Sequence, residues 1–356
     1  MNIESLKRQR YSQWDDLCNK SNDAWFWHTS GGLQYQLAYA APFEPVDRSF
    51  VVVHDGQIVG GIPLIEMSEQ GTRVFGLNGQ PGPNPIFAPL LGDKQKKKAQ
   101  KMLFEELDGL ATDHGVKRCA VSYSPLMLCA SERNTLKANP LVQFGFLDTS
   151  WISQCMLLDA PLDSLKKGIR HGHQYDLKRG EKVLRTEIFD ASVLTRDIYV
   201  QYENLHEKAA GRKTRSSLTF DMMENFIRDR NAFLIGAKQG ENWVGFAYFY
   251  IYNKHAYLGS ACNDPDASTL PIAHCIQWAA IEYMHRQQVS SYEVGWQDYG
   301  PTLLSVPSQK EIDISKFKRG FGGEPVTVFA GEKYYDKEYF LEVYTDRMNA
   351  YKQTII

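Results

Sequence analysis

The chain has 356 residues, of which 43% are hydrophobic and 23% are charged, and its formal net charge is −2 at pH 7. This length predicts two domains, because a single hydrophobic core seldom grows beyond roughly 250 residues. The nearly balanced charge provides no overall attraction to DNA or to an anionic membrane, so binding of a polyanion must come from a local patch.

The N-terminus, the apolar runs and the cysteines all predict a cytoplasmic protein. Residues 1–17, MNIESLKRQRYSQWDDL, lack the apolar stretch of a signal peptide. The longest apolar run, VGFAYFYIY (244–252), is about half of the roughly 18 residues that a membrane helix needs. The six cysteines form no C-x-x-C pair and lie mostly among apolar neighbours, as reduced core thiols do.

A faint repeat of predicted elements divides the chain near residue 150. Each half has, in order, a hairpin, a strand, a helix and a strand: 49–67, 74–79, 96–115 and 119–125 in the first, and 232–252, 255–262, 270–288 and 291–296 in the second. A hairpin, a third strand, a crossover helix and a parallel strand, occurring twice, predict an α/β fold of two duplicated halves. We expect domains at 1–150 and 151–356.

The second half carries further predicted elements. They are a strand at 151–159, a basic helix at 162–182, a strand at 184–189, helices at 197–212 and 218–230, and a final helix at 336–353. Near the C-terminus, FKRGFGG (317–323) predicts a cationic strand end that runs into a flexible glycine turn.

The basic helix has the highest local charge density. Between Lys166 and Arg185 it contains seven lysines or arginines and two acidic residues. Such a patch suits tRNA, nucleotide phosphates or an anionic glycan, and a solvated helix face is the alternative. His171 and His173 form an H-x-H pair with no accompanying ligand cluster, so we expect no metal site.

Several of these segments, in this order, resemble the FemAB/FemX-like acyltransferases. They are IRHGHQYDLKRGEKVLRTEIF (169–189), LHEKAAGRKTRSSLTFDMMENF (205–226), the hairpin at 232–252 and FKRGFGGEPV (317–326). The likeness is closest to relatives described as GNAT-type acetyltransferases and linked to polysaccharide or cell-envelope genes. F-K-x-x-F-G-G is the most specific motif, and A-A-G-R-x-T-R (209–215) is the second. The resemblance implies two tandem GNAT-like domains, each a mixed sheet flanked by helices.

The resemblance also implies roles for the FKRGFGG segment. In the family, the Phe-Lys pair that matches Phe317 and Lys318 lies beside the reacting ester. Acyl transfer to an amine passes through a tetrahedral oxyanion, and a fixed cation near that oxygen stabilises it. Lys318 is therefore the predicted oxyanion-stabilising residue, with a solvated lysine at an exposed hairpin end as the alternative.

Further cations are candidate substrate-binding residues. Arg212, Lys213 and Arg215 follow a predicted helix end, and arginine suits bidentate contact with phosphate or carboxylate. The family arginine that matches Arg212 helps to hold a phosphorylated acceptor, whereas a simple helix-end role is the alternative. Arg170 in the basic helix and Arg319 next to Lys318 complete this set.

The donor and the general base are less well defined by the sequence. GNAT proteins hold the CoA pyrophosphate with a Q/R-x-x-G-x-G/A loop, and neither 79–97 nor 263–274 has that pattern. Asp298 follows a predicted strand where sheet ends open, and it is the candidate base, with a structural hydrogen bond as the alternative. Tyr257 is the aromatic residue best placed to line a sugar or acyl pocket; most of its aromatic neighbours are expected in the core.

These observations predict an N-acyltransferase that uses direct attack in a ternary complex, because no serine elbow, Cys–His signature or P-loop is present. The expected acceptor is an amine on a sugar, a peptide or a lipid-linked envelope precursor. We expect no tightly bound cofactor and acyl-CoA as co-substrate. One alternative is an aminoacyl-tRNA-dependent peptidoglycan bridge enzyme, although the long helical-hairpin insertion of many such members is missing after Arg212. The other is a non-catalytic protein that binds a glycan or a nucleotide.

Overall fold

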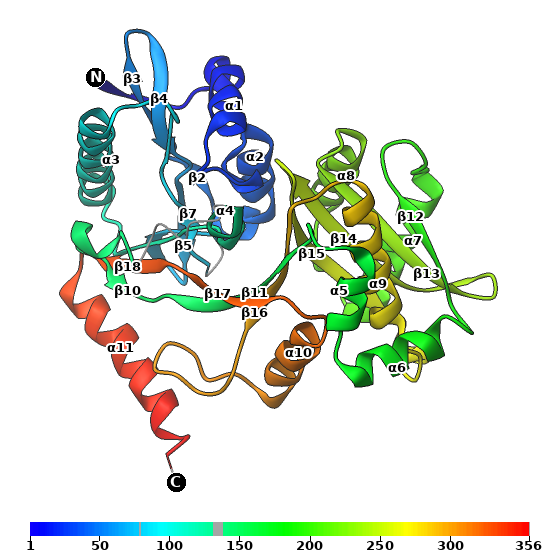
Figure 1. Cartoon of the computed structure of the whole chain (residues 1–356). Helices are drawn as coiled ribbons and strands as arrows, with labels where there is room; N and C mark the ends of the chain where they lie inside the picture. Colours follow the sequence, from blue (N-terminus) through cyan, green and yellow to red (C-terminus); the bar gives the residue numbers. More distant parts are fainter. Residues whose placement is uncertain (78–79, 131–137, 356) are drawn as a thin grey trace. The chain divides into compact units, whose positions relative to one another are not determined.

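In a computed structural model, residues 1–77, 80–130 and 138–355 are described. They divide into two units, each treated separately below (Figure 1). Unit 1 comprises 1–152, 298–312 and 327–356, and unit 2 comprises 153–297 and 313–326. The first division lies close to the boundary expected near residue 150. The segments 298–312 and 327–356, which the sequence analysis had assigned to the second domain, belong to unit 1 instead.

Unit 1 contains two sheets and the helices that cover them. Its strands are β1 (Asn2–Ser5), β2 (Val46–Asp47), β3 (Phe50–His54), β4 (Gln57–Ile62), β5 (Ile65–Glu69), β6 (Thr72–Phe75), β7 (Gly82–Pro83), β8 (Ile86–Phe87), β9 (Arg118–Ser122), β10 (Leu147–Asp148) and β18 (Ala330–Tyr334). Its helices are α1 (Tyr11–Lys20), α2 (Ser30–Tyr39), α3 (Asp93–Asp113), α4 (Pro125–Ala130) and α11 (Lys337–Lys352). One sheet has the order β1-β3-β4-β8 and the other β10-β18-β9-β6-β5-β2.

The C-terminal segment joins unit 1 through strand pairing. Strand β18 pairs antiparallel with β9, so that Lys333 lies opposite Cys119. The Lys333 ammonium donates to Asp108 of α3 at 2.7 Å. Backbone pairing with a strand two hundred residues earlier is a long-range contact that leaves no local sequence signal, which explains why the sequence analysis assigned this segment to the wrong half.

Unit 2 is built on one seven-stranded sheet. In chain order its elements are β11 (Trp151–Leu157), α5 (Leu162–Gly168), α6 (His171–Gly180), β12 (Arg185–Phe189), α7 (Arg196–Ala210), α8 (Ser217–Arg228), β13 (Ala232–Gln239), β14 (Asn242–Tyr252), β15 (His255–Asn263), α9 (Ile272–Arg286), β16 (Ser291–Gln297), α10 (Gln309–Arg319) and β17 (Glu324–Val328). The sheet order is β12-β13-β14-β15-β16-β11-β17. Strands β15 and β16 are parallel and are joined by α9, as the predicted crossover requires.

Helices cover both faces of this sheet (Figure 1). Residues of α9 pack with Phe249 and Tyr292 in one core. On the opposite face, the Tyr248 hydroxyl donates to the Met223 carbonyl of α8 at 2.8 Å. Because side chains alternate along a strand, Glu293 and Gly295 face the α7 and α8 side while Tyr292 and Val294 face α9.

The predicted basic helix at 162–182 is two helices, α5 and α6, which Figure 1 shows as separate segments. The chain is extended at Ile169 and Arg170, and Ile169 is buried. Gly168 is the last residue of α5, and the low helix propensity of glycine favours a helix end there. The break brings Arg170 and the start of α6 into contact with the FKRGFGG segment, as described below.

Candidate active site

The FKRGFGG segment lies at the end of a helix. Residues 317–319 form the last turn of α10, and the glycine turn follows before β17. The predicted strand end is therefore wrong. The helix begins with a reciprocal cap, because Glu311 accepts from the backbone and hydroxyl of Ser308 at 2.7 Å, and the Glu311 amide donates to the Ser308 hydroxyl at 3.3 Å.

Lys318 lies against a kinked part of β16. Its ammonium donates to the Trp296 carbonyl at 3.4 Å, and the side chain is half-buried. Gly295 has a φ of +120°, and a Cβ there would lie 2.8 Å from the Lys318 nitrogen. The backbone conformation favours glycine at 295, and a Cβ there would displace the ammonium from its present position.

Gln297 and Arg319 form hydrogen bonds at the same part of β16. The Gln297 amide donates to the carbonyls of Gly295 at 2.9 Å and Trp296 at 3.1 Å. Arg319 in turn donates to the Gln297 side-chain oxygen at 2.8 Å. Arg319, predicted as a substrate-binding residue, therefore has a structural partner in this network, and Gln297 is a positioning residue that the sequence analysis did not identify.

A buried carboxyl group lies next to Lys318. Glu293 is two residues before Gly295 on the same face of β16, and it accepts a hydrogen bond from the Ser153 hydroxyl at 2.6 Å. Burial raises the pKa of Glu293 to about 7, although the Ser153 hydrogen bond and the charge of Lys318 both lower it. A carboxyl with a pKa near neutrality can exchange a proton at physiological pH, which is what general acid–base catalysis needs.

Tyr257 lies opposite Glu293 in the parallel pair of β15 and β16. Burial raises the pKa of Tyr257 well above its usual value, and the charge of Glu293 adds to that effect. The ladder between these strands extends only from His255 to Tyr257 on β15, although β15 continues to Asn263. Tyr257 therefore lies where the two strands stop pairing, opposite Glu293.

Phe317 packs inward next to Lys318. Its ring lies 5.2 Å from both His173 and Phe321 and 5.0 Å from His274, measured between ring centroids. The Phe317 carbonyl lies 2.9 Å from the His173 Nε2 atom. Arg170, also a predicted substrate-binding residue, contacts this cluster through His173 at 3.2 Å. The H-x-H pair thus contributes one buried histidine, His173, and one exposed histidine, His171.

The structure separates the three cations after α7. Arg212 and Lys213 are exposed beyond Gly211, which ends the helix with a φ of +65°. Arg215 is half-buried and donates to His206 Nε2 at 2.9 Å. Burial and the charge of Arg215 lower the pKa of His206 to about 4, so this histidine is neutral at physiological pH.

The segment before α9 departs from a phosphate-binding loop in structure as well as in sequence. Asp264 and Asp266 both form ion pairs with Lys208 of α7, with 2.7 Å between the ammonium nitrogen and each carboxylate oxygen. Two carboxylates at this position disfavour a pyrophosphate there. Between β15 and α9 a pocket is lined by Phe246, Ala247, Ala261, Cys262, Asn263, Ala273, Ile276 and Gln277.

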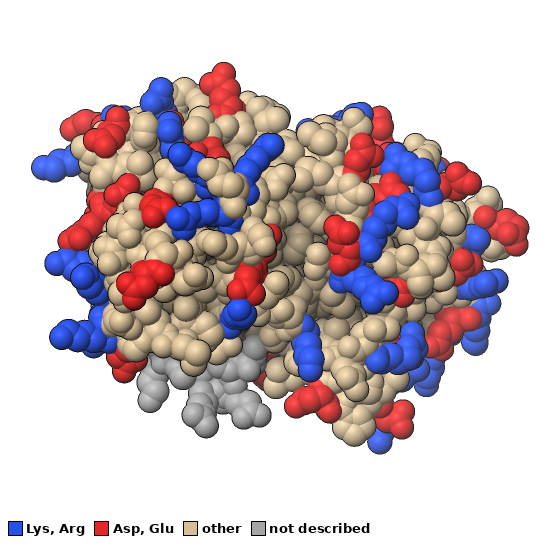
Figure 2. Space-filling view, turned by 90° about the horizontal axis from the view of Figure 1, so that it is seen from above, with Lys and Arg blue, Asp and Glu red and all other residues tan. Residues whose placement is uncertain are grey.

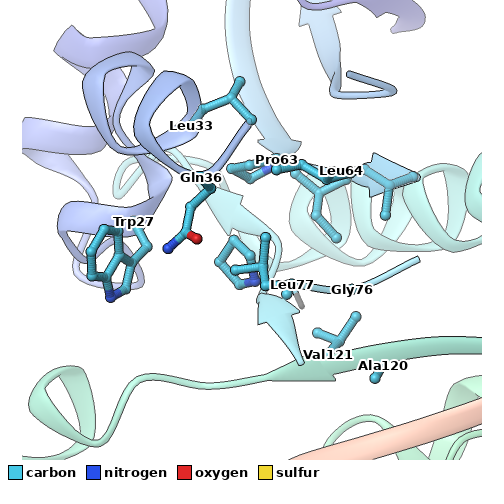
Figure 3. A pocket seen from close by; sticks show the side chains of 13 residues that line it. Trp27, Leu33, Gln36, Pro63, Leu64, Gly76, Leu77, Ala120 and Val121 are labelled. Carbon is cyan, nitrogen blue, oxygen red and sulfur yellow. The ribbon is translucent and has the colours of Figure 1, made fainter. Parts of the chain in front are cut away.

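Asp298, the predicted base, is half-buried and follows β16 directly, but it is grouped with unit 1. Unit 1 also has a pocket between α2 and the strands of its larger sheet, lined by Trp27, Leu33, Gln36, Ile62, Pro63, Leu64, Ile65, Gly76, Leu77, Gly82, Pro83, Ala120 and Val121. Figure 3 shows the Gln36 amide extending into the space between Trp27 and Leu77. None of these described lining residues is charged, so the pocket suits an uncharged group.

Charge on the surface is mixed. Figure 2 shows lysines and arginines interspersed with acidic residues over the face that it displays. Within the described ranges, no three His, Cys, Asp or Glu side chains gather as a metal site would require. No described helix combines the length and the apolar character of a transmembrane span.

Similarity to known proteins is found at the level of structure and not of sequence. No protein-family model and no curated protein matches the sequence. Among solved structures, FemX superposes with a TM-score of 0.68 at 10% identity, covering 97% of this chain and 100% of FemX. The C-terminal domain of a putative lysylphosphatidylglycerol synthetase from Agrobacterium fabrum gives 0.57 at 12% identity, covering 96% and 95% of the two chains. A tandem GNAT protein from the clavulanic acid biosynthesis pathway gives 0.53 at 13% identity, covering 94% and 98%.

At these identities the comparisons establish the fold. The chain therefore has the FemX-like, tandem-GNAT α/β fold that its sequence resembles.

Proposed function

We propose that the protein is an N-acyltransferase whose chemistry takes place in unit 2. The observation that carries this proposal is a buried carboxyl of raised pKa, Glu293, within the electrostatic influence of the Lys318 ammonium, at the point where β15 and β16 stop pairing. Strongly shifted ionisable groups next to a charge partner are typical of active sites. The tandem-GNAT fold supports the same reading.

Each group has a defined role in the proposed reaction. The amine lone pair attacks the acyl carbonyl carbon and forms the new C–N bond, while the carbonyl oxygen becomes an oxyanion. Lys318 stabilises that oxyanion, and Glu293 accepts the proton that the amine nitrogen must lose. Collapse of the tetrahedral species restores the carbonyl and breaks the bond to the leaving group. Tyr257 lines the acyl position beside them. Glu293 replaces Asp298 as our first candidate for the base.

The open edge of β15 supports a donor with an extended, amide-bearing arm. Beyond Tyr257 this strand pairs with β14 on one side only, so its other edge is available for hydrogen bonds to an added chain. Acyl-CoA has such an arm and is the donor we propose. Because Asp264 and Asp266 are negatively charged, we expect the phosphates of acyl-CoA to bind away from the start of α9.

The acceptor that we propose is an amine on a sugar, a peptide or an envelope precursor. Arg212 is exposed and available for a phosphate or carboxylate of such an acceptor. An aminoacyl-tRNA donor is the second candidate, since the FemX-like fold extends over nearly the whole chain.

A matched donor panel tests the proposal. The protein is incubated with acetyl-CoA, longer acyl-CoAs and charged tRNAs, each with amino sugars and amino-terminal peptides, and products are detected by mass spectrometry. We expect an N-acylated amine from at least one acyl-CoA and none from desulfo-CoA. Transfer from charged tRNA alone would replace the proposed donor. Absence of transfer and of thermal stabilisation with every donor would favour a non-catalytic binding protein.

A further inference from the structure

The buried histidine of the H-x-H pair has no role in the proposed reaction, and its Nε2 atom and part of its ring contact the helix end and turn that carry Lys318. From this geometry we infer that His173 is a positioning residue, which holds the end of α10 so that the Lys318 ammonium stays beside Gly295. The inference rests on the proposed function of Lys318 and adds a residue of another element, α6, to the site.

The first observation is a directional hydrogen bond. His173 Nε2 lies 2.9 Å from the Phe317 carbonyl, which can only accept, so the Nε2 atom carries the proton. The other ring nitrogen, Nδ1, lies 3.2 Å from the Arg170 guanidinium, which can only donate. Both neighbours therefore select the same neutral tautomer.

The second observation is a steric fit between the histidine ring and the glycine turn. A Cβ on Gly320 would lie 2.1 Å from His173 Nε2, so only glycine allows this approach. The Arg170 backbone amide also donates to the Gly320 carbonyl at 2.8 Å. The extended residues between α5 and α6 thus contact the turn that follows Lys318.

The third observation is the aromatic surround, which restrains the ring and the helix end together. The His173 ring centroid lies 4.9 Å from Phe321 and 4.5 Å from His274. Phe317 precedes Lys318 directly, so fixing its carbonyl and its ring on both sides fixes the backbone from which the lysine extends. A displacement of about 1 Å at a reacting group can reduce the rate by about a hundredfold.

The HGH and FKRGFGG segments fit each other closely. His173 needs Gly320 for space, and the Phe317 carbonyl, which also accepts from the Gly320 backbone amide at 3.0 Å, lies in the last turn of α10. The histidine adds a second hydrogen bond to this carbonyl, from outside the helix. His171, in the same segment, is exposed and provides a matched control.

Substitutions at position 173 test the inference in the full-length protein, with the donor and acceptor found by the panel above. His173→Phe keeps an aromatic ring but removes the donor, whereas His173→Gln places an amide N–H at a similar distance from the backbone. We expect His173→Phe to reduce kcat by about 10- to 100-fold with the acceptor KM nearly unchanged. We expect His173→Gln to recover most of this loss and His171→Phe to match the parent.

A double variant separates positioning from a general structural effect. If His173 acts through Lys318, then adding His173→Phe to Lys318→Ala causes little further loss of kcat. A multiplicative loss in the double variant, or parent-like turnover in His173→Phe, would overturn the inference. If the Phe variant does not fold, His173→Asn, whose amide is too short to reach Phe317, takes its place. Parent-like turnover in Lys318→Ala would instead remove the proposed function itself.

Discussion

Replacing Glu293 with glutamine should make the stability of the protein less dependent on pH. Below its unfolded-state pKa of 4.5 the carboxyl is neutral in both states. As the pH rises, the unfolded chain loses this proton while the folded protein keeps it until about pH 7, so the folded state loses stability over that interval. The full shift corresponds to about 3 kcal/mol, of which about 2 kcal/mol develops between pH 5.5 and pH 8.5.

Glutamine has no such ionisation and can still accept the Ser153 hydrogen bond. The free energy of unfolding of the variant, measured in urea titrations, should therefore gain about 2 kcal/mol relative to the parent as the pH goes from 5.5 to 8.5. Glu311→Gln is the control, because the Ser308 hydrogen bonds lower the pKa of that exposed carboxyl, so it is ionised in both states from pH 5.5 to 8.5 and its parent–variant gap should stay constant over this interval. A parent–variant gap at Glu293 that stays constant with pH would refute the argument that burial holds this carboxyl neutral.

Three further variants test other assignments of the candidate site. Gly295→Ala places a Cβ within 2.8 Å of the Lys318 nitrogen at a φ of +120°, so we expect a tenfold or greater loss of kcat, on the order of 1–2 kcal/mol of strain, and a lower melting temperature by calorimetry. Asp298→Asn should retain kcat within about threefold in steady-state assays. Glu293→Gln should reduce kcat by about 10²- to 10⁴-fold and should abolish the rise in activity through pH 7. A larger loss of kcat in Asp298→Asn than in Glu293→Gln would restore Asp298 as the base. Arg212→Ala should raise the acceptor KM with kcat unchanged, and an unaltered KM would return this arginine to a helix-end role.

Local patterns were sufficient to predict most elements of the chain. The hairpin predicted at 232–252 is β13 and β14, and the helix predicted at 270–288 is α9, because alternation and helical periodicity are strong over such lengths. Residues 78–79 of the strand predicted at 74–79 lie outside the described residues. The helix α10 was missed although its S-x-x-E capping pattern, Ser308 to Glu311, is a usable signal.

The candidate site depends more on contacts between distant segments. The family motif led to the prediction of Lys318 and Phe317 as site residues. Glu293 has no such motif and is a single acidic residue within a predicted strand. The alternation of a strand does not distinguish a buried carboxyl from a solvated one. Its partner Ser153 lies 140 residues earlier in the chain. His173 was considered only as a metal ligand, because its true partner, the Phe317 carbonyl, is a backbone atom that no side-chain pattern reveals.

Turnover of Lys318→Ala, compared with Lys316→Ala, tests the central claim most directly. Both lysines lie in α10, but Lys316 is exposed and pairs with Asp313 at 3.2 Å, so its loss removes a surface charge only. With melting temperatures close to the parent, we predict a loss of about 10²- to 10³-fold in kcat for Lys318→Ala and almost none for Lys316→Ala. Equal turnover in the two variants would contradict a role for the Lys318 ammonium in stabilising the oxyanion.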